Sequence, residues 1–291
     1  MRVLITGAAG QLGQELQRQC PPAVEVLAFG REQLDLADSA ACQAAVHAHR
    51  PDWVISAGAY TAVDRAEAEP ELAQRVNAGA PGAFAAALAQ TGGSLLQVST
   101  DFVFNGAQGT PYRPDQPCDP LGVYGRTKAA GEQAAAQGLP AERLCILRTS
   151  WVYGPVGRNF LLTMLKLHGI KAEAGEPLRV VADQVGCPTS TATLAEACWA
   201  VLARGAHGIH HCSDAGAASW YDFAVAIGEI AQASGRLSQT AVVEPITTAD
   251  YPTPARRPGY SLLECSATRS LLGLPARHWR EALAAVIDRL P

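Results

Sequence analysis

Charged side chains are scarce in this sequence, and so are aromatic ones. Charged residues make up 17% of the chain and aromatic residues 6%, with a net charge of −4. There is no basic run and no patch of basic and aromatic residues, which argues against a nucleic-acid-binding protein. No apolar run approaches the roughly 20 residues of a membrane-spanning helix, and the first residues lack the pattern of a signal peptide. We therefore expect a cytoplasmic protein with neither a nucleic-acid nor a membrane partner.

Paired cysteines are also missing. The eight cysteines are scattered without a CxxC spacing, and this usage favours reduced, packed thiols over disulfides or a zinc site. His207, His210, His211 and Cys212 lie close together in the sequence, but neighbouring residues of a strand point to opposite faces of its sheet. The sequence therefore predicts no metal site.

What the chain does have is a glycine-rich turn near its start. Residues 2–6 form a short apolar, β-branched run that is typical of a buried strand. This run leads into Gly7, Gly10 and Gly13, and the residues that follow favour a helix. Strand, glycine turn and helix in this order let the backbone approach a pyrophosphate, which then lies at the helix N-terminus. The spacing is GxxGxxG rather than the more common GxGxxG, and it predicts a dinucleotide site.

Strands and helices alternate through the first half of the chain. Short apolar runs predict the strands, and Ala-rich stretches predict the helices between them. This alternation is typical of an α/β fold, a doubly wound parallel (Rossmann) sheet with helices on both faces. After residues 2–6, strands are predicted at 25–29, 53–56, 94–99 and 144–148, and helices at 39–49 and 70–90.

The second half is expected to bind the substrate. We predict a dinucleotide-binding domain over residues 1–150, and a smaller mixed α/β substrate-binding domain over 151–291 that also adds elements to the first sheet. Residues 105–122, where Pro and Gly become frequent, predict a long loop over the active site. Within the second half, helices are predicted at 154–171 and 220–233, and strands at 177–185 and 209–212.

Polar side chains follow the predicted strands at the edge where ligands of such a sheet bind. Arg31 would accept the 2′-phosphate of NADP, whereas Glu32 beside it would favour the 2′-hydroxyl of NAD, so NADPH and NADH both stay open. Asp35 lies either beside the adenine or at the N-terminal cap of the next helix. The small residues around Ala59 let the backbone lie close to a cofactor, and the hydroxyl of Thr100 follows the fourth strand.

Tyr124 and Lys128 lie one turn apart on the same face of a predicted helix. A phenol is too weak an acid to exchange protons near neutral pH, but a neighbouring ammonium favours the phenolate and lowers the pKa of the tyrosine. The pair can then act as a general acid or base in carbonyl chemistry, and Thr100 could reach the same carbonyl oxygen. The spacing alone also occurs by chance, as a surface pair on many helices.

Further segments occur together with this pair, in a fixed order. They are GAAGQLG at 7–13, AYTAVD at 59–64, STDFVF at 99–104, RTSWVYG at 148–154, DQVGCPT at 183–189 and YPTPARRP at 251–258. With them the chain resembles the dTDP-4-dehydrorhamnose reductases, a subgroup of the extended short-chain dehydrogenase/reductase superfamily. The Tyr–Lys pair marks only the superfamily, whereas STDFVF, RTSWVYG and YPTPARRP point to the subgroup. The resemblance spans nearly the whole chain.

The resemblance implies a reaction, the reduction of the 4-keto group of dTDP-4-dehydro-β-L-rhamnose to dTDP-β-L-rhamnose. NADPH or NADH would donate the hydride, and the product would supply rhamnose for surface polysaccharide. Tyr124 would donate a proton to the sugar oxygen, and Lys128 would hold the nicotinamide ribose and lower the pKa of Tyr124. Thr100 would bond the keto oxygen or tune Tyr124. The implied catalytic residues are therefore Tyr124, Lys128 and Thr100.

The resemblance also implies the residues that hold the two ligands. Arg256 and Arg257, in a Pro-rich loop, are the best candidates to pair with the substrate diphosphate, because an acidic protein needs local cations there. The substrate-binding residues would be Thr100, Asp101, Trp151 and Arg257. The cofactor-binding residues would be Gly7, Gly10, Gln11, Leu12, Gly13, Arg31, Asp35, Leu36, Ala59, Tyr60, Thr61, Tyr124 and Lys128.

Three other functions stay open. A nucleotide-sugar dehydratase of the same superfamily usually has Asp-Glu after the threonine, because elimination of water needs a second acid and base, whereas here Phe102 follows Asp101. A nucleotide-sugar epimerase fits the superfamily, but Trp151 and the Thr-Asp-Phe context argue against it. The regulatory subunit of methionine adenosyltransferase resembles the same subgroup and acts by binding. The retained Tyr–Lys pair favours catalysis over that binding role.

Assembly is the point at which this chain departs from some relatives. Those relatives form metal-bridged dimers through acidic residues, and Glu15 matches one such position. Residues 190–196, however, have no acidic residue near their start, so no magnesium site is transferred. We expect a monomer or a weak homodimer with a nucleotide-sugar substrate.

Overall fold

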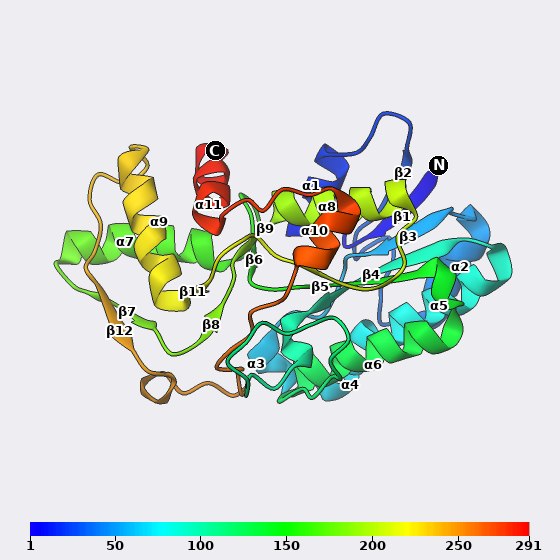
Figure 1. Ribbon diagram of the computed structural model, residues 1–291, viewed down its shortest axis with the longest axis horizontal. Helices are drawn as coiled ribbons and strands as arrows, with labels where there is room; N and C mark the ends of the chain where they lie inside the picture. Colours follow the sequence, from blue (N-terminus) through cyan, green and yellow to red (C-terminus); the bar gives the residue numbers. More distant parts are fainter. Residues whose placement is uncertain (291) are drawn as a thin grey trace.

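A computed structural model describes residues 1–290 of the protein. The strands of its central sheet are β1 (Arg2–Thr6), β2 (Glu25–Phe29), β3 (Trp53–Ser56), β4 (Ser94–Thr100), β5 (Leu144–Thr149) and β10 (Gly208–Cys212). They lie in the order β10-β5-β4-β3-β1-β2, and every neighbouring pair is parallel (Figure 1). The predicted parallel α/β sheet is therefore confirmed. Chain order reverses between β1 and β3, which is where such sheets bind their ligands.

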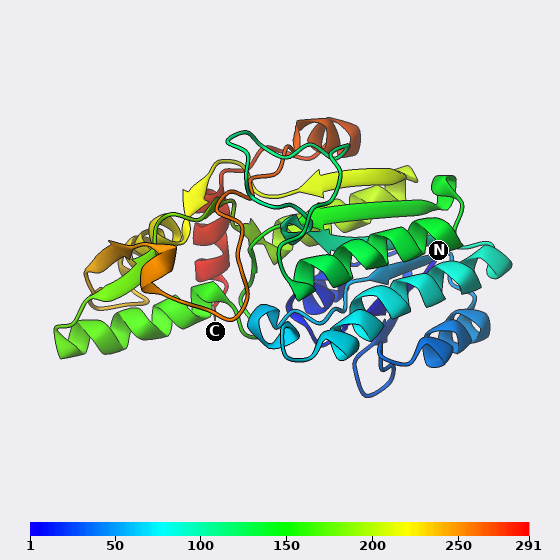
Figure 2. The ribbon, with the colours of Figure 1, turned by 90° about the horizontal axis from the view of Figure 1, so that it is seen from below.

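Helices cover both faces of this sheet (Figure 2). They are α1 (Gln11–Arg18), α2 (Ser39–His49), α5 (Ala80–Thr91), α6 (Val123–Gly138), α8 (Thr191–Arg204) and α10 (Ser266–Leu272). Leu4 of β1 packs in the core beneath α2, α5 and α6, whereas its neighbours Val3 and Ile5 pack on the opposite side with α1 and α8. This alternation along one strand is what places apolar side chains in two cores.

The helix predicted over residues 70–90 is wrong in one respect, because it is interrupted. The segment consists of α4 (Pro70–Gln74), the π turn η1 (Arg75–Gly79) and α5. Pro81 has no N–H to donate to the carbonyl of Asn77, so the regular helical ladder is not completed there. The Asn77 oxygen faces α6 instead, 2.0 Å from the place where a Cβ on Gly131 would lie. A glycine is therefore required at that point of α6.

The second half forms a smaller mixed unit on one side of the sheet (Figure 1). Its helices are α7 (Phe160–Ala174), α9 (Trp220–Ala233) and α11 (Trp279–Asp288). Its short strands pair as β6 (Val152–Tyr153) with β9 (Thr189–Ser190), β7 (Leu178–Val181) with β12 (Val243–Ile246), and β8 (Val185–Gly186) with β11 (Ala218–Ser219). The core of this unit contains Leu161, Phe223 and Trp279.

Two predicted elements of the second half have different bounds in the structure. The helix expected at 154–171 begins only at Phe160, where the side chain of Asn159 caps it by accepting a hydrogen bond from the Leu162 N–H at 3.0 Å. The strand expected at 177–185 is divided into β7 and β8, because Asp183 turns the chain to accept hydrogen bonds from Thr248. The second half also supplies β10 and α8 to the first unit, and the domain boundary at residue 150 stays a prediction.

Shorter elements connect these layers. They are α3 (Val63–Ala66), η2 (Asp101–Val103), η3 (Ala141–Arg143) and η4 (Thr248–Asp250). Within residues 1–290, no helix combines the length and the hydropathy that crossing a membrane requires. The same residues hold no group of three or more His, Cys, Asp and Glu side chains placed to bind a metal ion. All eight cysteines are free thiols.

Candidate active site

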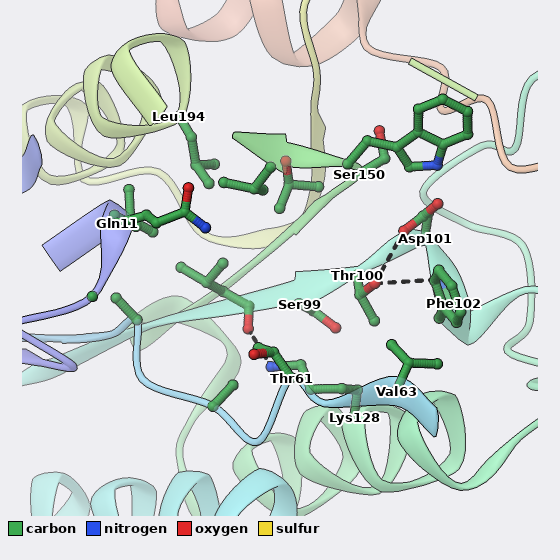
Figure 3. A pocket seen from close by; sticks show the side chains of 18 of the residues that line it. Gln11, Thr61, Val63, Ser99, Thr100, Asp101, Phe102, Lys128, Ser150 and Leu194 are labelled. Atoms are coloured by element: carbon green, nitrogen blue, oxygen red, sulfur yellow. Dashed lines mark hydrogen bonds between the residues drawn. The ribbon is translucent and has the colours of Figure 1, made fainter. Parts of the chain in front are cut away.

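A cavity of about 650 Å³ opens at the carboxyl edge of the sheet. Its walls come from the glycine turn after β1, from the ends of β3, β4 and β5, and from the smaller unit (Figure 3). Parallel strands of this order bring their carboxyl ends together, so residues far apart in the sequence share one hollow. Of the predicted site residues, those that line it are Gly7, Gly10, Gln11, Leu12, Gly13, Ala59, Thr61, Thr100, Asp101, Tyr124, Lys128, Trp151 and Arg257.

The glycine turn brings backbone against backbone. Gly7 has a φ of 67°, in the left-handed region, and a Cβ there would lie 2.7 Å from the Cα of Gly58 at the end of β3. A Cβ on Gly13 would lie 2.2 Å from the Gly7 oxygen. Gly10 is the N-cap of α1, so the first N–H groups of that helix face the cavity. Such a turn accepts a pyrophosphate, because no side chain stands between the backbone donors and the anion.

A second cavity of about 260 Å³ adjoins the first and shares Gly7, Gly58 and Ala59 with it. This second cavity is the place of the remaining predicted cofactor residues, which are Arg31, Asp35, Leu36 and Tyr60. Arg65 and Glu69 also line it, and the Tyr60 hydroxyl donates to Glu69 Oε2 at 2.7 Å. Glu32 is exposed and is not among the described residues that line it.

Tyr124 and Lys128 enter the first cavity from α6, and Thr100 enters it from the end of β4. Burial raises the pKa of Tyr124 to about 12, and a hydrogen bond with Thr100 acts in the opposite direction. Lys128 is 3% exposed, and its Nζ donates to the Val98 oxygen at 2.7 Å. Burial lowers the pKa of Lys128 to about 8, against the attraction of the Glu132 carboxylate one turn further along α6.

One expectation about this pair is wrong. The ammonium of Lys128 was expected to lower the pKa of Tyr124, but within residues 1–290 Lys128 is not among the groups that act on it. Lys128 is directed to the backbone of β4, and loss of solvent disfavours the phenolate more than any neighbour favours it. The resulting tyrosine is protonated at neutral pH, which is the state that a proton donor needs.

Thr100 and Asp101 form a buried polar pair at the wall of the cavity (Figure 3), and both act on the pKa of Tyr124. Thr100 Oγ1 donates to Asp101 Oδ1 at 3.0 Å and accepts from the Phe102 N–H at 3.2 Å. Burial raises the pKa of Asp101 to about 6, against hydrogen bonds with Ser261 and Thr100 that lower it. The hydroxyl of Thr100 is thus held in one orientation at the wall of the cavity.

An aromatic wall closes the side of the cavity that faces the smaller unit. Trp151 stacks on Trp220, with ring centroids 3.6 Å apart and planes 6° from parallel, and both rings line the cavity. Trp151 has a φ of 47°, which is unusual for a residue with a Cβ and marks local strain. A Cβ on Gly186 would lie 2.8 Å from the Trp151 ring, so that strand approaches it closely. Sequence reasoning missed Trp220, and its position at the start of the predicted helix 220–233 was the available signal.

The Pro-rich loop at 251–258 reaches the same cavity through one of its two arginines. Arg257 lines the cavity and is 24% exposed, whereas Arg256 is exposed and is not among the described residues of the wall. The predicted loop at 105–122 is irregular, as expected, but its expected place over the active site is wrong. None of its residues is among the described residues that line the cavity. Instead Pro114 of this loop accepts a hydrogen bond from Arg148 Nη1, and Tyr112 of the loop pairs with Leu263 in an isolated β-bridge.

Comparisons with known proteins agree with this geometry. The family model described as RmlD substrate binding domain matches residues 1–291. A dTDP-4-dehydrorhamnose reductase of Sinorhizobium fredii is 39% identical over 295 residues, covering 99% of this chain and 97% of that protein. A probable dTDP-4,6-dihydroxy-2-methyloxan-3-one 4-ketoreductase of Streptomyces antibioticus is 43% identical over 287 residues, covering 97% of this chain and 93% of that protein.

A solved structure gives the same result for the fold. The dTDP-4-dehydrorhamnose reductase from Bacillus anthracis, in complex with NADP, superimposes with a TM-score of 0.90 at 34% identity and covers 99% of both chains. Fold, site residues and relatives thus lead to one conclusion. The chain belongs to the dTDP-4-dehydrorhamnose reductase family of the RmlD substrate-binding type.

Proposed function

We propose that this protein reduces the 4-keto group of dTDP-4-dehydro-β-L-rhamnose to dTDP-β-L-rhamnose with NADPH or NADH, and so supplies rhamnose for polysaccharide. The observation that supports this most is the meeting of Thr100, Tyr124 and Lys128 with the glycine turn in one cavity. A reductase needs its proton donor beside the place where the nicotinamide reaches the substrate. The relatives named dTDP-4-dehydrorhamnose reductase support the same reaction.

In this mechanism the bound nicotinamide supplies the hydride chemistry. Tyr124, protonated because burial raises its pKa to about 12, donates its proton to the oxygen of the reduced carbonyl. On binding of the substrate, Thr100 would turn its single O–H proton from Asp101 to the same oxygen and so hold it within reach of Tyr124. Lys128 is largely protonated at pH 7, since its pKa is about 8, and its ammonium would hold the nicotinamide ribose. Solvent then returns a proton to Tyr124.

The two cavities would hold different parts of the ligands. The glycine turn, with Gln11 and Leu12, would hold the pyrophosphate, and the second cavity, with Asp35, Leu36 and Tyr60, would hold the adenine and its ribose. Asp101 and Trp151 would contact the sugar, and Trp220 would extend the aromatic surface for its methyl group. Arg257 would pair with the diphosphate. We also propose that the protein acts in the cytoplasm as a monomer or a weak homodimer.

A second candidate is the reduction of a related dTDP-keto sugar. The relative from Streptomyces antibioticus that is 43% identical is named for a 4-keto reduction of dTDP-4,6-dihydroxy-2-methyloxan-3-one. That reaction needs the same proton donor and the same cofactor site, so the residues of the cavity serve both. The two candidates differ only in the substituents of the sugar ring, which would face Trp151 and Trp220.

The deciding assay follows the absorbance of NADPH or NADH with freshly generated dTDP-4-dehydrorhamnose. We expect oxidation of the cofactor at one equivalent per equivalent of sugar reduced. A folded sample that binds a cofactor but oxidises neither one contradicts the proposal. If only dTDP-4,6-dihydroxy-2-methyloxan-3-one is reduced, the second candidate is correct. Turnover of a nucleotide sugar without net oxidation of cofactor would instead indicate a dehydratase or an epimerase.

A further inference from the structure

Arg257 is held by a carboxylate from α3. Its Nη1 donates to Asp64 Oδ1 at 3.0 Å, and its Nη2 donates to Asp64 Oδ2 at 2.8 Å. The two residues are 193 positions apart in the sequence. Asp64 belongs to α3, directly after the segment that carries Ala59 and Thr61 on the cofactor side. The ion pair therefore ties the Pro-rich loop at 251–258 to the cofactor side of the cavity.

Asp64 also fixes the backbone of that loop. Its Oδ1 accepts the N–H of Ala255 at 3.2 Å. Within the loop, Nη1 of Arg257 also donates to Thr253 Oγ1 at 2.5 Å and to the Ala255 oxygen at 3.3 Å. The hydrogen bond from Arg257 keeps the pKa of the Asp64 carboxyl below its usual range, so the carboxylate stays ionised at neutral pH. The loop and the guanidinium are thus held together by one charged group.

This arrangement leaves one edge of the guanidinium free. A guanidinium can donate in pairs, either through Nη1 and Nη2 or through Nε and Nη2. Asp64 accepts hydrogen bonds from the Nη1 and Nη2 edge. Within residues 1–290 the Nε of Arg257 has no hydrogen-bond partner. The side chain lines the cavity and is 24% exposed. A second anion can therefore bind the Nε and Nη2 edge without displacing Asp64.

We infer that Asp64 is a positioning residue for the nucleotide sugar: it orients Arg257 so that the free edge of the guanidinium receives the diphosphate of the substrate. This inference rests on the proposed function for the identity of the ligand. A diphosphate suits the free edge because two of its oxygens match paired N–H donors. Asp64 touches neither substrate nor cofactor in this role, and it acts through Arg257.

The test compares ligands with and without phosphates. Isothermal titration calorimetry measures the binding of dTDP and of thymidine to the wild type, Asp64→Asn and Arg257→Gln. We expect Asp64→Asn to weaken dTDP binding by about tenfold or more, because the guanidinium loses its orientation, and to leave thymidine binding unchanged. In turnover assays the KM for the nucleotide sugar rises, while kcat and the KM for the cofactor change by less than about twofold. The double variant should bind dTDP no more weakly than Arg257→Gln alone.

A matched control is Asp115→Asn, which breaks an exposed ion pair with Arg113 on the surface and should change none of these values. Asp64→Glu keeps the charge and serves if Asp64→Asn does not fold; it should restore part of the dTDP affinity. A folded Asp64→Asn with wild-type affinity for dTDP overturns the inference. Equal loss of thymidine and dTDP binding overturns it as well, since that result indicates a structural role. Failure of the proposed reaction is seen separately, as absent turnover in a wild type that still binds dTDP.

Discussion

Burial acts in opposite directions on the two residues that would handle the proton. It raises the pKa of the Tyr124 phenol to about 12 and lowers the pKa of the Lys128 ammonium to about 8. Both shifts favour the neutral form of the group, as loss of solvent does. At neutral pH the tyrosine is fully protonated, and the lysine, whose pKa of about 8 still lies above neutral, is mostly charged. The site is thus set for donation of a proton rather than for its removal.

Tyr124→Phe should abolish turnover and leave cofactor affinity nearly unchanged. The substitution removes the proton donor but keeps the ring, which packs edge-on against Phe102 with centroids 5.5 Å apart. We expect kcat to fall by at least about 100-fold, the usual scale for a lost general acid. Tyr251→Phe, at a tyrosine that is 62% exposed, is the matched control. Steady-state kinetics and cofactor titration measure both quantities, and undiminished turnover would remove Tyr124 from the mechanism.

Lys128 should set the alkaline limit of activity. Because its pKa is about 8, the ammonium loses its proton as the pH rises through 8, and the rate should fall with it. The measurement is kcat/KM for the cofactor between pH 6 and 10, which reports groups of the free enzyme. Lys128→Arg is the matched variant, since a guanidinium keeps its charge over this range. A wild-type profile that stays flat to pH 9.5 would contradict the assignment.

Arg31 and Arg65 bring two cations to the second cavity, and this favours NADPH as the better hydride donor. Arg65 is also paired with Glu69 at 2.6 Å. Arg31 is therefore the cation that is more available to bind a phosphate. Arg31→Ala should raise the KM for NADPH by about tenfold, because a guanidinium–phosphate pair is lost. The KM for NADH should not change. Arg50→Ala, on the exposed end of α2, is the control, and equal effects on both cofactors would argue against a 2′-phosphate site.

At the scale of elements, the π turn η1 joins the cofactor segment to the catalytic helix. Asn77 in this turn is 1% exposed; its Oδ1 accepts the Tyr60 N–H at 2.8 Å, and its Nδ2 donates to the Tyr60 oxygen and to Thr127 Oγ1, each at 3.1 Å. Tyr60 lines the second cavity, and Thr127 lies on α6 beside Lys128. One amide side chain thus joins the Tyr60 segment to α6.

Asn77→Ala should therefore lower the free energy of unfolding by about 2 kcal/mol, since it leaves buried backbone groups of Tyr60 without partners. Urea denaturation measures this loss, and Gln74→Ala on the exposed side of the preceding turn is the control, with an expected change within about 0.5 kcal/mol. The cofactor KM should rise as well, because the Tyr60 segment is released. Equal stability of the two variants would show that the Asn77 network contributes nothing.

The elements that could be predicted from sequence are those that local pattern decides. The interiors of strands such as β1 and β3 are apolar, and the glycine turn directly after β1 favours a dinucleotide site over an ordinary βα turn. The break at Asn77 was not predicted, because its cause combines a local proline with a distant glycine on α6. Trp220 and the pairing of Arg257 with Asp64 were missed because their contacts also join residues that are distant in the sequence. Only tertiary packing brings those side chains to the cavity.

At the scale of the whole molecule, the two ends of the chain are tied together at one carboxylate. Glu15 of α1 is 4% exposed, and its oxygens accept hydrogen bonds from Arg18, Gln19 and Arg289. Arg289 follows α11 of the smaller unit, so the pair at 2.7 Å joins that unit to the first one. Sequence resemblance alone had matched Glu15 to a metal-bridging position. In this chain both of its oxygens are already engaged by guanidinium groups.

Because of these ion pairs of Glu15, the free energy of unfolding should depend on pH within a defined acidic range. Burial alone would raise the pKa of Glu15, but the hydrogen bonds from Arg18, Arg289 and Gln19 outweigh it and lower the pKa from 4.5 to about 2. A carboxyl whose pKa is lower in the folded state stabilises the fold above its unfolded pKa, and that contribution is lost as the pH falls from about 4.5 to 2. Because both arginines are partly exposed, solvent screening reduces the contribution to about 2 kcal/mol.

Glu15→Gln should therefore destabilise the protein at pH 7 by about 2 kcal/mol, and the difference from the wild type should shrink as the pH approaches 2. Urea denaturation at a series of pH values measures it. Glu25→Gln is the matched control, because the pair of Glu25 with Arg2 is exposed on both sides and such pairs contribute little. A wild-type-minus-variant difference that does not change with pH would mean that the ionised carboxylate is not what holds α1 to the end of the chain. The packing of Leu12 and Leu16 against α8, which needs no carboxylate, would still hold α1 in the first unit.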